Sequence, residues 1–459
     1  MLFNSQIFVF FFLPLVLAGY YALAWSRGLR QAWVIAASIA FYGYWDIRFV
    51  PLLVGLTMAN WLIALWFGRT RQNWIPLLGI VLNLCVLALF KYADFIRGSL
   101  FGVAGEPWEP WSLILPLGIS FFVFQKISYL ADLRRGDRHI YGFLDFWMFV
   151  TFFPQLIAGP LVRHNEIIPQ FERDPRGPDT WENLGRGLVL FIIGLTKKVV
   201  LADTLAHLAD PAFARAAHTT LTAAEAWVGG LAFTFQLYFD FSGYSDMAIG
   251  LALMFGLRLP INFNAPYKAV SSRDLWRRWH ITLSRFLRDY LYVPLGGSRK
   301  GEVRQAFNVI VTMLLGGLWH GANWNCVAWG GLQGVGLAVN HLWDRAGIRL
   351  PRLLSWAITF FFFVFTLMVF HSPGFPQAGR FLASMFGASG LGHVVLDREH
   401  ALALAGGAAL AFFGIPSQDL ALRWLQPRPW LAVPVGAFAI FVVLLVGGRL
   451  PNVFFYFQF

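Results

Sequence analysis

The chain alternates long apolar runs with short charged gaps. In the first third, the apolar runs fall at about residues 7–25, 32–45, 50–67, 74–90 and 112–130. Later runs fall near 184–201, 224–255, 325–343, 353–371, 401–415 and 430–447. A helix needs about 20 apolar residues to cross a bilayer, and the period-two alternation of barrel strands is absent. The pattern therefore predicts an all-α, polytopic integral membrane protein of roughly 11–13 helical elements.

Some stretches depart from simple spans. The run Phe143–Val162 is interrupted by Pro154 and by Gly159-Pro160, and proline removes a helix hydrogen bond. Non-helical backbone at membrane depth needs protein or a water-filled cavity around it, so we expect a bent or re-entrant segment here. Residues 163–183 and 372–400 are more polar, and we expect extramembrane connections there.

Composition and charge support this reading. Only 13% of the 459 residues are charged, against about 25% in soluble domains. No basic residue precedes the first run, which we interpret as a retained span rather than a signal peptide. The net charge of +12 comes from arginines at the ends of spans, which is typical of membrane topology rather than of nucleic-acid binding. The first gap (Arg27, Arg30), the third gap (Arg69, Arg71) and the fifth gap (Arg134, Arg135, Asp137, Arg138) carry net positive charge. We therefore expect the N-terminus outside the cytoplasm. A basic cytoplasmic face also suits anionic membrane lipids or a phosphate-bearing cosubstrate.

Charge and polarity concentrate in residues 262–329, among tryptophans. Ionisable groups in an apolar setting indicate a functional site. From Trp276 the apolar residues recur at spacings of three and four, which predicts a helix too short and too charged to cross lipid. We expect Trp276, Arg277, Trp279 and His280 to share this interfacial or re-entrant helix near the cytoplasmic entrance. His280 alone is as consistent with packing as with chemistry.

His320 is the strongest catalytic candidate. It follows the apolar run Phe307–Trp319 and lies beside Gly316, Gly317 and Gly321. Burial disfavours imidazolium, so a neutral ring able to accept a proton is expected. The three glycines leave room for a substrate to approach, and we expect two openings, one from each side, to meet at His320.

Other polar residues leave alternatives open. Asp240, Ser245 and Asp246 interrupt an apolar run, and either a structural hydrogen-bond network or part of the site accounts for them. A metal site would combine them with the histidines, but no HxxxH or CxxC pair supports one. Cys85 and Cys326 are interpreted as core residues without a disulfide. A hydrolase is disfavoured because the Gly-x-Ser-x-Gly elbow is absent.

At these residues the sequence resembles the membrane-bound O-acyltransferase family, and in particular its alginate O-acetyltransferase-like branch. The motifs that carry the resemblance are Gln236-Leu-Tyr-Phe-Asp-Phe-Ser-Gly-Tyr-Ser-Asp, Asn262-Phe-Asn-Ala-Pro-Tyr, Trp276-Arg-Arg-Trp-His-Ile-Thr-Leu-Ser and Leu314-Leu-Gly-Gly-Leu-Trp-His-Gly-Ala-Asn. The resemblance covers nearly the whole chain, as one membrane-embedded domain over residues 1–459 with a central tunnel. One departure is Phe370-His371-Ser372, where an arginine is expected after the phenylalanine.

The resemblance implies an O-acetyltransferase of the bacterial inner membrane, which moves acetyl from cytoplasmic acetyl-CoA towards an exported polysaccharide such as alginate. Transfer would be direct or through a periplasmic acetyltransferase partner. Acetyl-CoA would be a cosubstrate, and no bound cofactor or metal is expected. The family's invariant histidine corresponds to His320, as general base or transient acyl carrier, and its second histidine corresponds to His280, which would orient the thioester or stabilise its oxyanion. The candidate substrate-binding residues are Trp276, Arg277, Trp279, Tyr238, Asp240, Ser245 and Asn323.

Two other function classes are alternatives to an enzyme. A precursor transporter or flippase commonly shows inverted repeats, but the polar block at 236–325 has no counterpart in the first half. A scaffold for polymer secretion predicts that replacing His320 leaves acetylation intact. Under the enzyme hypothesis, replacing His320 or His280 is severe. Replacing His341, expected at a span end outside the polar block, is mild.

Overall fold

The computed structural model describes residues 1–425, 429–447 and 454–455. Most of these residues are helical and none of them lies in a strand, which confirms the predicted all-α class. The chain groups into two compact units, described separately below. The first comprises Met1–Ile192, Tyr244–Pro260 and Leu425–Val453, and the second Ile193–Gly243, Ile261–Trp424 and Phe454–Phe459.

Several described helices are long and apolar enough to cross a membrane. By length and composition these are Ile47–Thr70, Trp74–Ala104 and Arg352–His371, and a helix pair bent by 71°, Arg398–Phe413 with Ser417–Trp424, also qualifies if it is taken as one span. Shorter apolar helices lie at Phe8–Ala22 and Val433–Leu445. The predicted spans are thus often subdivided by π-turns and bends.

The first unit packs around a cluster of aromatic rings. Its elements are η1 (Phe8–Phe12), α1 (Leu13–Ala22), α2 (Arg27–Gly43), η2 (Ile47–Phe49), α3 (Val50–Thr70), α4 (Trp74–Leu87), η3 (Ala88–Tyr92), α5 (Ala93–Ala104), α6 (Ile119–Arg134), α7 (Phe143–Thr151), α8 (Phe153–Leu156), α9 (His164–Ile167), η4 (Ile168–Glu172), α21 (Pro429–Gly447) and most of α10 (Thr180–Thr196). The ring of Phe8 lies 5.9 Å from Phe41 and 6.1 Å from Phe153, all three buried. Edge-to-face aromatic pairs at such distances add to the stabilisation from burial alone.

The interruption predicted between residues 143 and 162 is confirmed. α7 ends at Thr151, Phe152 takes ψ 108°, and α8 follows for one turn. A Cβ at Gly159 would overlap the backbone of Gln155, so only glycine permits this turn.

The positive gaps of the sequence meet on one face of the first unit. Arg27 forms an ion pair with Asp145 at 2.6 Å, and the backbone at Gly68 lies against Ile140. Arg30, which is buried, donates to the carbonyls of Phe171 and Arg173. The first, third and fifth gaps and the 163–174 connection therefore share one side, as the alternation of charge requires.

The second unit contains residues 262–329, where charge and polarity concentrate. Its elements are η5 (Lys197–Ala202), α11 (Asp203–Ala216), the first two thirds of α12 (Ala223–Met254), η6 (Pro266–Lys268), α13 (Ser272–Arg278), α14 (Ile281–Leu287), η7 (Arg288–Tyr292), α15 (Glu302–His320), α16 (Trp324–Arg345), α17 (Arg352–His371), α18 (Phe375–Met385), α19 (Arg398–Phe413), α20 (Ser417–Asp419) and η8 (Leu420–Trp424).

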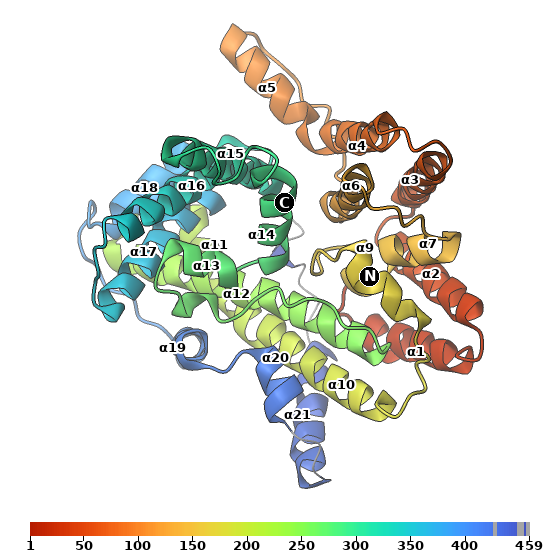
Figure 1. Ribbon diagram of the computed structural model, residues 1–459. Helices are drawn as coiled ribbons and strands as arrows, with labels where there is room; N and C mark the ends of the chain where they lie inside the picture. The colour runs from red at the N-terminus through yellow and green to blue at the C-terminus, as the bar shows by residue number, and fades with distance from the viewer. Residues whose placement is uncertain (426–428, 448–453, 456–459) are drawn as a thin grey trace. The chain divides into compact units, whose positions relative to one another are not determined.

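Helices α15 and α16 form a close antiparallel hairpin (Figure 1). A Cβ at Gly317 would overlap the carbonyl oxygen of Cys326, and one at Gly330 would overlap that of Met313. Small residues allow such backbone approach in membranes. Arg345 at the end of α16 pairs with Glu302 at the start of α15, so His320 lies at the opposite end of the hairpin from this ion pair.

The expectation of a loop over residues 372–400 was wrong in part, because the helix α18 occupies Phe375–Met385. Gln377, Phe381 and Met385 are buried on one face, and Arg380 donates to the carbonyls of Ala216 and Ala217. The helix is short and amphipathic, so no long apolar run marks it. Cys85 and Cys326 are both free thiols. Cys326 is buried, as expected of a core residue, whereas Cys85 is exposed on α4, so its assignment to the core was wrong.

Candidate functional site

The stretch predicted to be one interfacial helix is two helices. α13 ends at Arg278, Trp279 is extended with φ −102° and ψ 127°, and α14 starts at Ile281. Trp276 and Arg277 therefore lie on a helix as predicted, whereas the prediction was wrong for Trp279 and His280. The break arises because the backbone at 262–264 bonds to this point: Asn264 N–H donates to Arg278 O and Ile281 N–H to Asn262 O.

His280 is held in the break by Asn262. The ring is fully buried, and its backbone is left-handed, with φ 44° and ψ 52°. Such a conformation in a non-glycine residue is strained and recurs at functional sites. Asn262 Oδ1 lies 3.1 Å from His280 Nδ1 and accepts from Thr282 N–H at 3.3 Å and Thr282 Oγ1 at 2.9 Å.

These contacts assign the tautomer of His280. The Thr282 amide can only donate, which identifies the Asn262 atom as the oxygen, and an oxygen there requires His280 Nδ1 to carry a hydrogen. In the neutral ring, Nε2 then carries the lone pair. A neutral His280 can therefore accept a proton or hydrogen bond at Nε2, but it cannot donate from Nε2 to an oxyanion.

His320 is the last residue of α15 and lies beside His280, as expected from their shared motif block. The two ring centroids are 6.2 Å apart. Rings of Trp319, Trp329 and Phe370 surround His320 at 5.0, 5.2 and 5.8 Å, and 5% of the residue is exposed. The two histidines thus share an aromatic enclosure, where water is largely excluded and electrostatic interactions are strong.

Tyr238 and Trp279 form a further aromatic wall. Their centroids are 6.3 Å apart, and Tyr267 lies 5.1 Å from Tyr238 and 6.0 Å from Trp279. Trp279 also packs edge-on against Phe263 at 5.1 Å. The predicted substrate-binding residues Tyr238 and Trp279 are therefore brought together, from α12 and from the break before α14.

Trp276 and Arg277 line a different feature, a basic groove of about 560 Å³. We use "basic groove" for the cavity lined by Arg273, Trp276, Arg277, Ile281, Ser284, Arg285, Arg288, Tyr292, Glu302, Gln305, Ala306, Val309, Leu337, Ala338, His341 and Leu342. Arginine is the side chain best suited to bidentate recognition of phosphate. This part of the site can therefore bind an anionic substrate.

His341 lies in the last turns of α16, at the end of the helix as expected, and it also lines the basic groove. α16 packs along α13: Trp276 Nε1 donates to Gln333 at 3.2 Å, and the Arg273 amide donates to Asn340. Arg273 also pairs with Asp344 at 2.8 Å. These contacts bring the last turns of α16 against the arginines, a proximity that sequence spacing does not reveal.

Asp240 belongs to a buried ion-pair network. Lys198 Nζ lies 2.7 Å from Asp240 and 2.8 Å from Asp203. The second carboxylate oxygen of Asp240 accepts from the amide of Phe455 at 3.0 Å. Buried charges require this kind of pairing, so the geometry favours the structural alternative for Asp240.

The remaining candidates lie in other settings. Asn323 caps α16 by accepting from the Cys326 amide at 2.7 Å, which is a usual N-cap role. Ser245 and Asp246 are buried on the part of α12 that belongs to the first unit. Among the described residues, no group of three His, Cys, Asp or Glu side chains is arranged to hold a metal ion.

Two positioning residues were missed from the sequence, Asn262 and Gln333. Asn262 opens the motif Asn-Phe-Asn-Ala-Pro-Tyr, and a buried amide in an apolar segment must find partners. That signal indicates a polar contact but not which residue makes it.

Comparison with known proteins identifies the family. Residues 34–375 match the family model described as the membrane-bound O-acyltransferase family. The chain belongs to this family. The protein is therefore a membrane-bound O-acyltransferase, which confirms both the resemblance and the predicted enzyme class.

Individual relatives of this O-acyltransferase agree. It is 41% identical to a peptidoglycan O-acetyltransferase of Helicobacter pylori, over 87% of this chain and 82% of the relative. It is 43% identical to the probable alginate O-acetylase AlgI of Pseudomonas aeruginosa, over 90% of this chain and 82% of the relative. A teichoic acid D-alanyltransferase of Streptococcus thermophilus is 26% identical over 65% of this chain and 76% of the relative.

Proposed function

We propose that the protein is an O-acetyltransferase of the bacterial inner membrane, which takes acetyl from cytoplasmic acetyl-CoA and delivers it towards an exported polysaccharide. The relatives at 41–43% identity are an acetyltransferase of peptidoglycan and a probable acetylase of alginate. The observation that carries the proposal is the enclosure of His280 and His320, 6.2 Å apart, in the same unit as the basic groove.

The basic groove supports acetyl-CoA as donor. Four arginines and His341 line it, with Glu302 as its carboxylate, and the pyrophosphate and 3′-phosphate of CoA are strongly anionic. Val309 lines the groove and precedes His320 by eleven residues on α15, a rise of about 16 Å. A nucleotide held in the groove would direct its slender pantetheine arm along this hairpin towards the histidines.

In the proposed chemistry, His320 takes the proton from the accepting hydroxyl as its oxygen attacks the thioester carbonyl. The carbon–sulfur bond then breaks, and the proton passes to the leaving thiolate. Alternatively, His320 attacks the carbonyl itself, the carbon–sulfur bond breaks, and the CoA thiolate leaves with the ring proton as a thiol. The accepting hydroxyl then takes the acetyl from the imidazole, and its proton returns to the ring. His280, with its lone pair on Nε2, orients the reacting groups as an acceptor.

The acceptor is proposed to be a hydroxyl of an exported glycan, reached directly or through a periplasmic acetyltransferase partner. We propose that the aromatic wall of Tyr238 and Trp279 lies alongside the thioester, and that two openings meet at His320. Trp276 and Arg277 are assigned to the donor end.

The test uses purified protein in proteoliposomes supplied with radiolabelled acetyl-CoA and a hydroxyl acceptor. A general base contributes typically 10²–10⁴-fold to rate, so His320→Ala should be nearly inactive at equal protein level, with His280→Ala also severe. His341→Ala and Arg277→Ala should mainly raise the KM for acetyl-CoA while kcat changes little, because they line the groove and not the enclosure. Full activity of His320→Ala would refute the catalytic assignment, and an unchanged KM in both groove variants would refute the donor site.

A further inference from the structure

A group of exposed arginines lies where two long apolar helices of the first unit reach the membrane surface. The helices Ile47–Thr70 and Trp74–Ala104, both long and apolar enough to cross a bilayer, are separated by a short turn. We use "arginine patch" for the exposed side chains at this turn and after α6: Arg69, Arg71, Arg134, Arg135 and Arg138. The ends of spans lie at the level of the lipid headgroups, and the arginine patch is therefore placed at that level.

Packing contacts bring the two segments of the arginine patch together. At the end of α3, a Cβ at Gly68 would lie 3.0 Å from the Ile140 side chain. A Cβ at Gly79, five residues after the start of α4, would lie 2.6 Å from the side chain of Leu130, four residues before the end of α6. The turn between α3 and α4 and the connection after α6 therefore share one surface.

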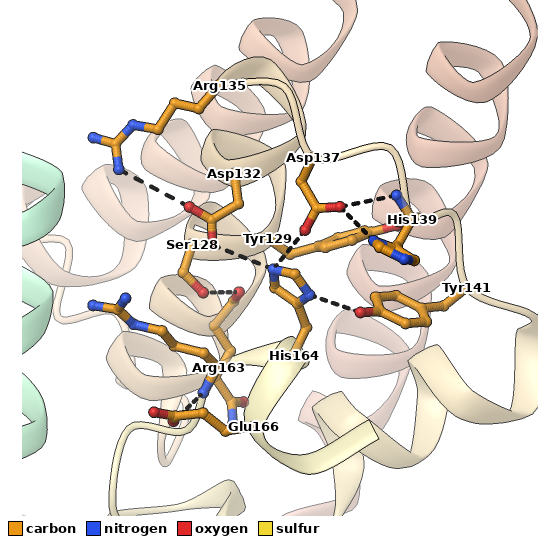
Figure 2. Close-up of polar contacts among 11 residues, drawn as sticks. Ser128, Tyr129, Asp132, Arg135, Asp137, His139, Tyr141, Arg163, His164 and Glu166 are labelled. Carbon is orange, nitrogen blue, oxygen red and sulfur yellow. Dashed lines mark hydrogen bonds and ion pairs between the residues drawn. The ribbon is translucent and has the colours of Figure 1, made fainter. Parts of the chain in front are cut away.

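The acidic residues of the connection are turned inwards from this surface. Asp132 and Asp137 both point at the buried ring of His164, whose Nε2 lies 3.2 Å and 3.8 Å from their oxygens (Figure 2). Asp137 also accepts from the His139 amide at 2.9 Å. The two carboxylate side chains are 21% and 24% exposed, whereas the side chain of Arg135 is 44% exposed. The fold therefore covers much of the negative charge and presents the positive charge.

Most of the arginine patch has no ionic partner within the described residues. Arg135 lies 3.9 Å from Asp132, but the other four arginines form no ion pair with any residue that the structure describes. Basic side chains close to a membrane surface are attracted to anionic lipids. The guanidinium group, moreover, matches the geometry of phosphate oxygens. The arginine patch is therefore free to bind a phosphate group.

Arg71 adds an independent observation, because its backbone has the conformation that glycine favours. It ends α3 with φ 58° and ψ 21°, and its amide donates to the Phe67 carbonyl at 2.8 Å. Glycine is the usual residue at such a helix end, since other side chains are strained there. Strained residues often have a functional role, which for Arg71 we assign to its charge.

Two exposed tryptophans border the arginine patch. Trp66 and Trp74 pack edge to face with ring centroids 5.0 Å apart, and they are 43% and 50% exposed. Tryptophan is enriched at the boundary between hydrocarbon and headgroups, where its ring contacts acyl chains. The surface thus combines positive charge for a phosphate with apolar area for the acyl chains below it.

We propose that the arginine patch, with Trp66 and Trp74, is a binding site for an anionic phospholipid. The lipid phosphate would lie among the arginines, and its acyl chains along the two tryptophans. The net positive charge of the surface selects an anionic headgroup over a zwitterionic one, although both carry a phosphate. The site consists of residues of the first unit and does not depend on the proposed acetyl transfer.

Native mass spectrometry of the purified full-length protein in a neutral detergent tests this site, with phosphatidylglycerol and phosphatidylcholine of the same acyl chains as probes. The wild-type protein should bind phosphatidylglycerol in preference. Each arginine removed should weaken this binding about fivefold, so Arg71→Gln combined with Arg138→Gln should largely abolish the preference. Arg48→Gln combined with Arg176→Gln is the matched control, because it removes the same charge from arginines that are already paired with a neighbouring aspartate. The preference should be unchanged there.

Arg71→Gly separates lipid binding from folding. Glycine suits the left-handed backbone, so the unfolding midpoint without added lipid should be at or above that of the wild type, while binding of phosphatidylglycerol falls. Glycerol 3-phosphate carries the phosphate without acyl chains and should not displace the bound lipid.

Three results would each overturn the proposal. The first is equal binding of the two lipids by the wild-type protein, or a preference that survives in the double variant of Arg71 and Arg138. The second is an equal loss in the control variant, which would indicate general charge attraction rather than a site. The third is displacement by glycerol 3-phosphate, which would indicate a site for a free anion.

Discussion

At the residue scale, one amide oxygen positions His280, one of the two histidines that we propose to act in catalysis. Asn262 Oδ1 receives three donors, from His280 Nδ1, Thr282 N and Thr282 Oγ1, and all three residues are buried. This oxygen fixes the tautomer of His280 and supports its left-handed backbone. The ring is thereby oriented before any substrate arrives, which is how preorganised sites reduce the barrier to reaction.

Replacing Asn262 with Ala should lower the rate of acetyl transfer by about 10- to 10³-fold, because the orientation and tautomer of His280 are lost. Thr282→Val is the matched control, since it removes another donor to the same oxygen without touching the imidazole, and a much smaller effect is expected. The measurement is the rate of acetyl transfer at equal protein level, together with a pH–rate profile of each variant. Equal losses in both variants would contradict a specific role through His280.

A second residue-scale variant separates strain from chemistry. His280→Asn should be inactive yet fold at least as well as His280→Ala, because asparagine tolerates a left-handed backbone better than other non-glycine residues. Transfer rate and apparent unfolding midpoint of both variants provide the comparison. A lower midpoint for the asparagine variant would argue against the backbone assignment.

At the element scale, the α15–α16 hairpin sets the position of His320. Gly317 and Gly330 let the two helices touch at backbone distance, and Gly334 approaches the backbone of Ile310. Tight packing between helices makes the end of α15 a rigid support. His320 at that end is held against Trp329 of the partner helix.

Gly330→Ala should therefore destabilise the protein, because its Cβ would overlap backbone atoms of Met313 and Gly317, which cannot move aside as a flexible side chain can. Overpacking costs typically about 1–3 kcal/mol, and we expect an apparent unfolding midpoint lower by at least about 2 °C. Gly406→Ala on α19 is the control, since nothing lies within 4 Å of its added Cβ and alanine favours helix. A Gly330→Ala midpoint at or above that of Gly406→Ala would show that the hairpin tolerates separation.

At the scale of the whole molecule, the charge alternation along the first unit predicts how it crosses the membrane. The positive gaps lie together on one face, because Arg27 forms an ion pair with Asp145 and the backbone at Gly68 lies against Ile140. Positive connections remain in the cytoplasm. Residues 105–118 connect the end of α5 to the start of α6. These helix ends are opposite to the positive gaps, which lie at the start of α4 and at the end of α6.

Single cysteines test this topology after Cys85 and Cys326 are replaced with Ser. A membrane-impermeant maleimide added to intact cells should label a cysteine at exposed Glu106 and spare one at exposed Gln72, with both labelled after the membrane is permeabilised. The reverse pattern would invert the predicted orientation and place the arginine-rich face outside.

The sequence by itself determined the helical class, the membrane setting and the pairing of His280 with His320. These follow from local quantities: hydropathy over about 20 residues, charge at span ends, and polar residues crowded into one block. Tertiary structure decided the break at Trp279 and His280, because helical spacing continues through it and only bonds from residues 262–264 interrupt it. It also decided the place of His341, which depends on how α16 packs along α13, a contact between residues 57 apart in the chain. The hydrophobic pattern states which face of a helix is buried, but not which helix covers it, and a buried polar group takes its role from the partner that folding supplies.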